Sequence, residues 1–200
     1  MNPIPLTGGI AIAGLVVTLA SLVYLHIAPT GLSPVKNAVS EYGISRYRLW
    51  YRVATIALGI AGLAIAVCLD TALRGELPAV ILLAIFGIAR LLISWSPMDA
   101  VGSPRTRSGR IHNLLAIAAF ATATAAGFLA AGPIAATSGW GGFSTATIIF
   151  TWVMTVGSVG VILATVAAPL RRYFGVFERV IYVGIIGWLT VLAIASITIR

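Results

Sequence analysis

The side chains that could do chemistry gather in one run, SWSPMDAVGSPRTRSGRIHNLLAIAAF. It holds Asp99, Arg105, Arg107, Arg110 and His112 in a chain that otherwise consists mostly of Ala, Ile, Leu, Val and Gly. An aspartate and a histidine brought together across one loop can act as a proton-transfer pair, because the carboxylate fixes the tautomer of the imidazole. The same two side chains can equally have a structural role and hold the ends of two helices together.

The three arginines directly precede an apolar segment that begins at Ile111. A helix that starts there presents free amide hydrogens and partial positive charge, which together with the arginines suit a phosphate group. A lipid headgroup or a phosphorylated substrate would supply that group. The alternative is an ordinary basic loop held against anionic lipid.

Other polar residues are predicted to lie on the same side of the membrane. Glu41 could supply a second catalytic carboxylate or pair with an arginine of the third loop, and three more residues are predicted ligand contacts: His26, Ser40 and Asn113. Because these residues would lie at a similar depth in the membrane, they could form a common site with Asp99 and His112.

Arg90 lies within an apolar segment, about six positions before its polar end and so about 9 Å deep in a helix. A central arginine costs around 2.5 to 3.5 kcal/mol on insertion scales, so it usually faces a cavity or a partner. The alternative is a side chain that snorkels to the interface. We count Arg90 among the predicted ligand contacts.

The composition indicates a membrane protein. Of 200 residues, 60% are hydrophobic and 9% are charged, whereas a soluble domain is about a quarter charged. In a membrane protein the excess of basic residues indicates how the chain is oriented across the membrane, so we expect no nucleic-acid partner. Alternating Arg, Tyr and Trp in RYRLWYR is typical of an aromatic belt with snorkelling arginines.

The hydropathy pattern predicts an all-α protein, one domain over residues 1–200 that forms a six-helix transmembrane bundle. Each span needs about 20 apolar residues, and the expected spans are about 8–27, 52–72, 78–96, 111–132, 144–168 and 180–199. The leader before the first span has no Lys or Arg, so we expect a retained helix. Small residues at intervals of four predict close helix contacts, at Ala119, Ala123, Gly127 and Ala131 and at Gly160, Ala164 and Ala168.

The basic residues are distributed unevenly. Ten of the thirteen lie in or beside the first, third and fifth loops, and two, Arg74 and Arg200, lie on the other side. This asymmetry predicts that those three loops are cytoplasmic and that both termini are extracytoplasmic.

The pattern of metal-ligating residues favours no metal and no cofactor. The chain has two histidines, one cysteine, Cys68, and no HExxH, CxxC or Walker spacing. Haem held by His26 and His112 is geometrically conceivable but is not favoured.

Three elements of the chain resemble a bacterial and archaeal membrane-protein family, domain-of-unknown-function family 998. They are a Ser-Glu-x-Gly element after the first span, a Pro-x-Asp-x-x-Gly element after the third and an Ile-His pair opening the fourth, with matching residues Ser40, Glu41, Gly43, Pro97, Asp99, Gly102 and His112. The resemblance implies a protein of about six helices in a bacterial or archaeal cytoplasmic membrane. More distantly, the pattern is similar to Frag1 and DRAM type membrane proteins, some of which act in lipid remodelling.

The leading functional hypothesis is recognition or modification of an anionic lipid or prenyl-phosphate-like amphiphile at the cytoplasmic side, with anionic lipids as partners. One alternative is a small proton-coupled transporter with Arg90, Asp99 and His112 in its pathway. Another is a structural or accessory subunit that binds copies of itself or another membrane protein. The sequence leaves open whether the protein is an enzyme.

Overall fold

The fold is known from a computed structural model, which describes residues 4–73 and 77–199. Arg74 and Arg200 lie outside these ranges. Within the ranges all regular structure is helical, with six α-helices: α1 (Ile4–Ile27), α2 (Arg48–Ala72), α3 (Leu77–Ile93), α4 (Arg107–Ala136), α5 (Ser144–Val166) and α6 (Phe174–Thr198). Three short 3-10 helices lie in the connections: η1 (Val39–Ile44), η2 (Gly141–Phe143) and η3 (Ala168–Tyr173).

The predicted all-helical fold is confirmed, and each expected span falls on one helix. Five of the helices, all except α3, are long and apolar enough to cross a membrane, so the chain is a multi-pass membrane protein. The remaining helix, α3, has 17 residues. The largest difference from the predicted spans is at the start of α6, which begins at Phe174 rather than near residue 180.

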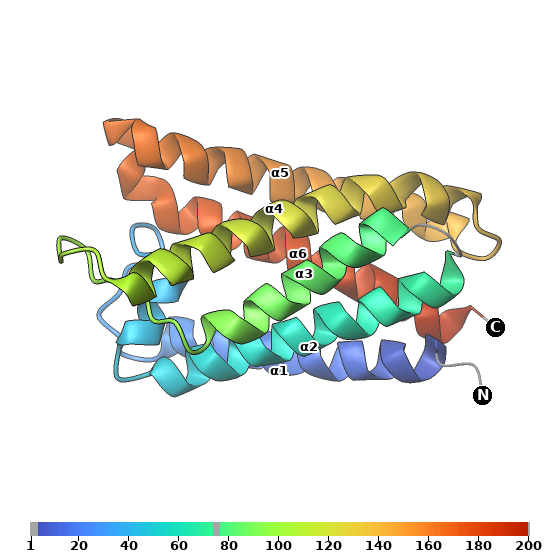
Figure 1. The fold of residues 1–200 in the computed structure, drawn as a ribbon, viewed down its shortest axis with the longest axis horizontal. Coiled ribbons are helices and arrows are strands. Elements are labelled where there is room, and N and C mark those ends of the chain that lie inside the picture. The colour runs from blue at the N-terminus through green and yellow to red at the C-terminus, as the bar shows by residue number, and fades with distance from the viewer. Residues whose placement is uncertain (1–3, 74–76, 200) are drawn as a thin grey trace.

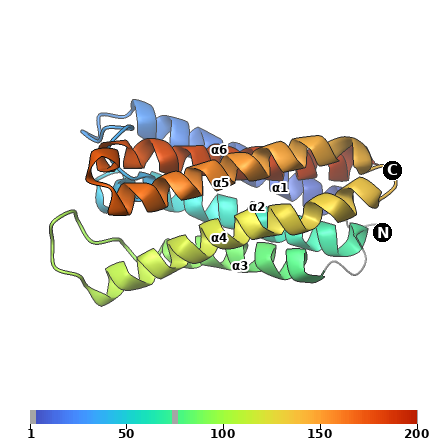
Figure 2. The ribbon, with the colours of Figure 1, turned by 90° about the horizontal axis from the view of Figure 1, so that it is seen from above.

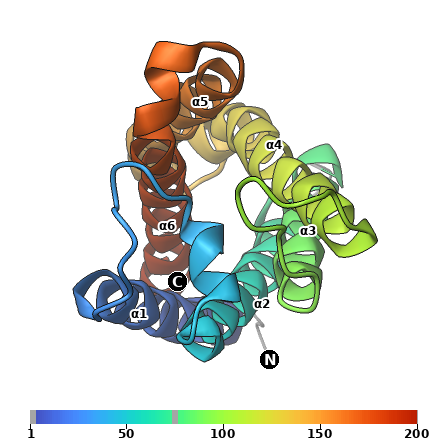
Figure 3. The ribbon, with the colours of Figure 1, turned by 90° about the vertical axis from the view of Figure 1, so that its left-hand side faces the viewer.

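The six α-helices stand side by side in a ring. Each helix packs against the next one in the chain, and α6 returns to α1 and closes the ring. The end-on view in Figure 3 shows this order, with η1 lying across the end of the ring. The ring encloses an interior, and the side chains that point into it determine which ligands the bundle can bind.

Small residues allow the close approach that the sequence predicts. Ala119, Ala123 and Gly127 of α4 are buried, and a Cβ atom at Gly127 would overlap Thr151 of α5. A Cβ atom at Gly160 of α5 would overlap the ring of Phe177 in α6. Because these residues have small side chains, the backbones pack closely and the ring forms without large hydrophobic side chains at every contact.

One end of the bundle carries three of the connections, over residues 28–47, 94–106 and 167–173 (Figure 1). The start of α1 and the end of α6 lie at the opposite end. The loop of residues 94–106 extends beyond the helices (Figure 2). All the basic residues predicted to share one side of the membrane belong to these connections or to their flanking helices, so we call this the arginine-rich end.

Candidate functional site

The loop of residues 28–47 is shaped by Glu41. Its carboxylate accepts hydrogen bonds from the backbone N–H of Ala38 at 2.8 Å and from the side-chain amide of Asn37 at 2.8 Å. Two residues later, a Cβ atom at Gly43 would lie only 2.8 Å from the ring of Tyr51. Glu41 therefore folds the loop, and Gly43 leaves room for the Tyr51 ring against η1.

The start of α6 holds the other side of this loop. The buried carboxylate of Glu178 accepts a hydrogen bond from the backbone N–H of Val39 at 2.6 Å. The guanidinium of Arg179 donates to the carbonyl of Asn37 at 2.9 Å and to the hydroxyl of Tyr42 at 3.3 Å. These bonds fix η1 against α6, so that the opposite face of η1 becomes a wall of the bundle interior.

The loop of residues 94–106 is fixed by Asp99. Its carboxylate accepts hydrogen bonds from the hydroxyl of Thr106 at 2.6 Å and from the backbone N–H of Thr106 at 3.0 Å. The Thr106 hydroxyl also accepts from the backbone N–H of Gly109 at 3.1 Å, which makes Thr106 the N-cap of α4. The pKa of Asp99 lies below its usual value, mainly because the Thr106 hydroxyl donates to it.

His112 is buried in the first turns of α4, with 3% of its surface exposed. Its Nδ1 donates to the backbone carbonyl of Ser96 at 2.7 Å. Because a carbonyl can only accept, Nδ1 carries the proton. The other ring nitrogen, Nε2, has no hydrogen-bond partner in the described part of the chain. Asp99 and His112 are thus anchored to different groups, and no hydrogen bond joins them.

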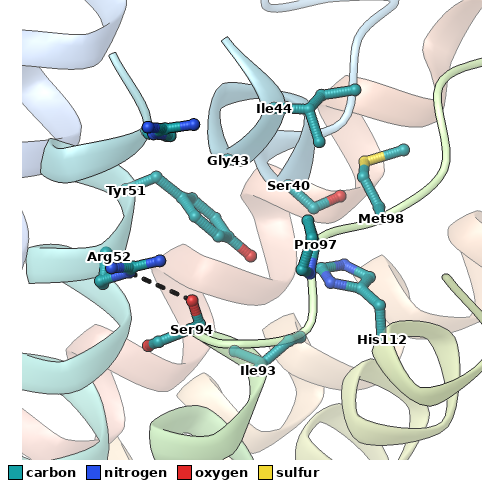
Figure 4. A pocket seen from close by; sticks show the side chains of 11 residues that line it. Ser40, Gly43, Ile44, Tyr51, Arg52, Ile93, Ser94, Pro97, Met98 and His112 are labelled. Atoms are coloured by element: carbon teal, nitrogen blue, oxygen red, sulfur yellow. Dashed lines mark hydrogen bonds between the residues drawn. The ribbon is translucent and has the colours of Figure 1, made fainter. Parts of the chain in front are cut away.

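A cavity of about 360 Å³ lies at the arginine-rich end, between η1, the start of α2, the end of α3 and the start of α4. Figure 4 shows Tyr51 extending from α2 into this cavity toward Pro97 and His112. It is lined by Ser40, Gly43, Ile44, Arg48, Tyr51, Arg52, Ile93, Ser94, Pro97, Met98 and His112.

The polar groups of this cavity keep unused hydrogen-bonding capacity. The Tyr51 hydroxyl is buried without a partner, and the side chains of Arg48 and Ser40 have no hydrogen bond within the described residues. Arg52 donates from Nε to the carbonyl of Ser94 at 3.2 Å, which leaves its terminal nitrogens free to bind a ligand. No Asp or Glu is among the lining residues. The cavity is therefore cationic and rich in donors.

Arg90 lies inside the ring and has 2% of its surface exposed. Its Nη2 donates to the hydroxyl of Tyr182 at 2.8 Å, and its guanidinium carbon lies 5.2 Å from the centre of the Tyr182 ring. Its Nε is buried and has no hydrogen-bond partner among the described residues. Of the two alternatives for Arg90, the structure has the inward-facing one, and the side chain does not snorkel to the surface.

The remaining predicted ligand residues lie apart from the cavity. The side chains of Arg105, Arg107, Arg110 and Asn113 are exposed and are not among its lining residues. His26 is exposed on α1, where its Nε2 accepts a hydrogen bond from Arg179 at 2.7 Å. Of the predicted site residues, the cavity thus brings together Ser40 and His112.

His26 borders a second cavity of about 290 Å³ between α1 and α6, whose lining is almost entirely apolar side chains such as Leu22 and Ile186. Bis-histidine ligation receives no support from the geometry, because Nδ1 of His26 is bonded to the Leu22 carbonyl at 2.6 Å and Nε2 to Arg179. Over residues 4–73 and 77–199 there is no group of three or more His, Cys, Asp or Glu side chains placed to hold a metal ion.

Several residues of this region were not predicted from the sequence. Arg48, Tyr51 and Arg52 were interpreted as an aromatic belt, and Glu178 and Tyr182 were assigned no role. A signal was present for Glu178, because an acidic residue close to a membrane span is rare and usually has a function. No sequence signal marks Tyr51, since its role depends on which way α2 is rotated.

Comparison with known proteins gives one family match. Residues 12–195 match the model of a family described as Protein of unknown function (DUF998). No curated protein and no solved structure matches the chain.

Proposed function

The chain belongs to the DUF998 family, and we propose that its cationic cavity binds the phosphate group of an anionic lipid or prenyl-phosphate-like amphiphile. The observation that carries the proposal is a set of donors around one cavity that have no protein partner among the described residues: the buried hydroxyl of Tyr51, the exposed guanidinium of Arg48 and the terminal nitrogens of the exposed Arg52. Arginine binds phosphate through several charge-assisted hydrogen bonds, and each hydrogen bond to a charged group contributes about 1.5 to 3 kcal/mol.

The unpaired state of these groups supports the proposal. Burying the Tyr51 hydroxyl without a partner costs about 1 to 3 kcal/mol. A phosphate oxygen in the cavity would accept a hydrogen bond from this hydroxyl and would balance the charge of Arg48, which lies one helical turn before Arg52 on α2. Without an anion only the buried Tyr51 hydroxyl carries this cost, because the side chains of Arg48 and Arg52 are exposed and water can solvate them.

The size of the cavity supports a headgroup as the bound part. Small-molecule sites are usually about 300 to 1,000 Å³, and this cavity, at about 360 Å³, is at the lower limit. It would accommodate a phosphate with a short polar extension, while the hydrocarbon chain of the same molecule stays in the bilayer. The position at the ends of α2, α3 and α4 suits a group at the membrane interface.

The residues through which the chain resembles its family give independent support. Four of them line the cavity: Ser40, Gly43, Pro97 and His112. Two others, Glu41 and Asp99, fold the loops that hold these four. All three elements thus contribute to the walls of the cavity or to the loops behind them, and the resemblance is centred on the proposed site.

We further propose that all six helices cross a bacterial or archaeal cytoplasmic membrane and that the arginine-rich end is cytoplasmic. The 17 residues of α3 are about 26 Å long, and α3 packs between α2 and α4, which are long enough to span. In this orientation the exposed side chains of Arg105, Arg107 and Arg110 would meet the anionic inner leaflet. These three arginines would hold the loop against the membrane surface that contains the ligand, whereas Arg48 and Arg52 would bind the headgroup of the ligand.

The test is lipid retention by the purified protein, measured by native mass spectrometry after exchange into mixed micelles that contain phosphatidic acid or a prenyl monophosphate. Arg48→Gln removes a guanidinium that has no hydrogen bond in the described structure, so the fold should persist. We expect it to lower retention of both amphiphiles, and Arg48→Gln with Arg52→Gln should lower it further.

The matched control replaces the same kind of side chain outside the cavity. The triple variant with Gln at Arg105, Arg107 and Arg110 should keep most of the bound amphiphile in micelles, because these side chains do not line the cavity. Equal retention by the Arg48→Gln protein and the wild type would contradict the proposal. If only the triple variant lost the bound amphiphile, the binding site would be the loop arginines rather than the cavity.

A further inference from the structure

The chemistry of His112 goes beyond binding. Within the cationic cavity, His112 is the one lining side chain that can carry an uncharged basic nitrogen at neutral pH. His112 is 3% exposed and lines the cavity, and its Nε2 has no hydrogen-bond partner among the described residues. The ligand proposed above would therefore meet this nitrogen.

The hydrogen bond to Ser96 fixes the tautomer that matters. Since Nδ1 donates to the Ser96 carbonyl at 2.7 Å, the lone pair of the neutral ring is on Nε2. The same bond stabilises positive charge on the ring if Nε2 forms a new bond, because Nδ1–H then becomes a stronger donor to the same carbonyl. An imidazole held in this way is prepared to act as a nucleophile.

We propose that the protein hydrolyses the phosphate monoester of its bound amphiphile, with His112 as the catalytic nucleophile. This inference rests on the proposed phosphate-binding function and adds a reaction to it. In the first step Nε2 forms a bond to phosphorus, the bond between phosphorus and the ester oxygen breaks, and its electron pair leaves with that oxygen. Water gives the leaving oxygen a proton, which releases the alcohol.

In the second step the hydroxide left by that water attacks phosphorus, and the bond between phosphorus and Nε2 breaks with its electron pair returning to the ring. The products are the alcohol and inorganic phosphate, and His112 is restored. Arg48 and Arg52 would neutralise the phosphoryl oxygens, and the Tyr51 hydroxyl would donate a hydrogen bond to one of them. Positioning and charge stabilisation are the main requirements of phosphoryl transfer.

The experiment uses the full-length protein in phosphatidylcholine vesicles that contain phosphatidic acid or farnesyl monophosphate, and it measures release of inorganic phosphate. A parallel sample is quenched in alkali and analysed by mass spectrometry for phosphohistidine, which survives alkali and is lost in acid. We expect phosphate release from at least one substrate and a modified peptide that contains His112.

The decisive variant is His112→Asn, because the asparagine amide nitrogen can take the place of Nδ1 and still donate to the Ser96 carbonyl. Phosphate release should fall to that of protein-free vesicles, and retention of the amphiphile is measured on the same variant. Retention without release in the wild type would overturn this inference and leave the binding proposal standing. Release that persists in His112→Asn would overturn it too, and absence of binding would overturn the proposed function itself.

Discussion

The guanidinium of Arg90 and the hydroxyl of Tyr182 form a hydrogen bond of 2.8 Å inside the ring of helices. Arg90 comes from α3 and Tyr182 from α6, on opposite halves of the chain. Among the described residues no carboxylate is hydrogen-bonded to this guanidinium, and its Nε has no partner at all. The phenol is therefore the main group that compensates a buried charge.

Tyr182→Phe should destabilise the protein more than Arg90→Met does. The first change leaves the charge of Arg90 buried without its acceptor and should cost about 3 kcal/mol. The second leaves only a neutral hydroxyl unsatisfied and removes the buried charge as well, so it should cost about 1 kcal/mol or less. The measurement is the free energy of unfolding in detergent micelles.

The double variant is the control for this pair. Arg90→Met added to Tyr182→Phe should recover stability, because neither the charge nor the orphaned hydroxyl then remains. If the two changes were simply additive, the hydrogen bond between Arg90 and Tyr182 would not carry the coupling inferred here.

Tyr51→Phe should raise stability and weaken binding. The Tyr51 hydroxyl is buried and has no partner in the part of the chain that the structure describes, so its removal relieves a desolvation cost of about 1 to 3 kcal/mol. If the same hydroxyl contacts the phosphate, amphiphile retention in native mass spectrometry should fall. A comparison is Tyr42→Phe, which removes a hydroxyl bonded to Arg179 at 3.3 Å and should not raise the Tm. A lower Tm for Tyr51→Phe would mean that the hydroxyl has a partner in the protein.

Gly109→Ala should loosen the start of α4. A Cβ atom at this position would overlap the carboxyl group of Asp99, so Asp99 would have to leave the Thr106 cap. Thr106 would then lose the two hydrogen bonds to Asp99 that hold this N-cap residue in place. Amide hydrogen exchange over residues 99–112 should become faster, while exchange in the centre of α2 should stay unchanged. Uniform exchange changes in both regions would instead indicate a global effect.

The contribution of Asp99 should depend on pH in a defined direction. Hydrogen bonds from Thr106 lower the pKa of Asp99 below its ordinary value of 3.8. A group with a lowered folded pKa contributes stability above its ordinary pKa and loses this contribution as the pH falls through the folded value. The difference in Tm between the wild type and Asp99→Asn should therefore be constant from about pH 5 to 7 and shrink below about pH 4. A difference that grows at low pH would contradict this assignment.

Hydropathy was sufficient to locate the six α-helices of the described residues, because each apolar segment is close to the length that a bilayer requires, but it gave no sign of the three 3-10 helices. It could not locate helix ends, since these are set by local bonds such as the Thr106 cap, which extends α4 to Arg107. At the other end, α4 continues through Pro133 to Ala136, although a proline usually ends a helix.

Two of the predicted site residues line the cavity, and each was predicted for a different reason. His112 is unusual in its apolar segment, whereas Ser40 was predicted from its side of the membrane and its Ser-Glu-x-Gly element. Tyr51 could not be found, because an aromatic residue near a span end is ordinary and its direction depends on helix packing. The link between Asp99 and His112 was inferred from sequence proximity, but each side chain bonds to a nearer backbone or hydroxyl group instead.

Orientation is the last property that can be tested directly. The distribution of basic residues predicts that the loop of residues 94–106 is cytoplasmic and that the connection between α4 and α5 is outside. Ser103 and Ser138 are exposed in these two connections, and Cys68 is fully buried, so it should give no background labelling. In intact cells, a membrane-impermeant maleimide should label Ser138→Cys and should label Ser103→Cys only after permeabilisation. The opposite pattern would place the cationic cavity outside the cell, where the anionic inner leaflet could not supply its ligand.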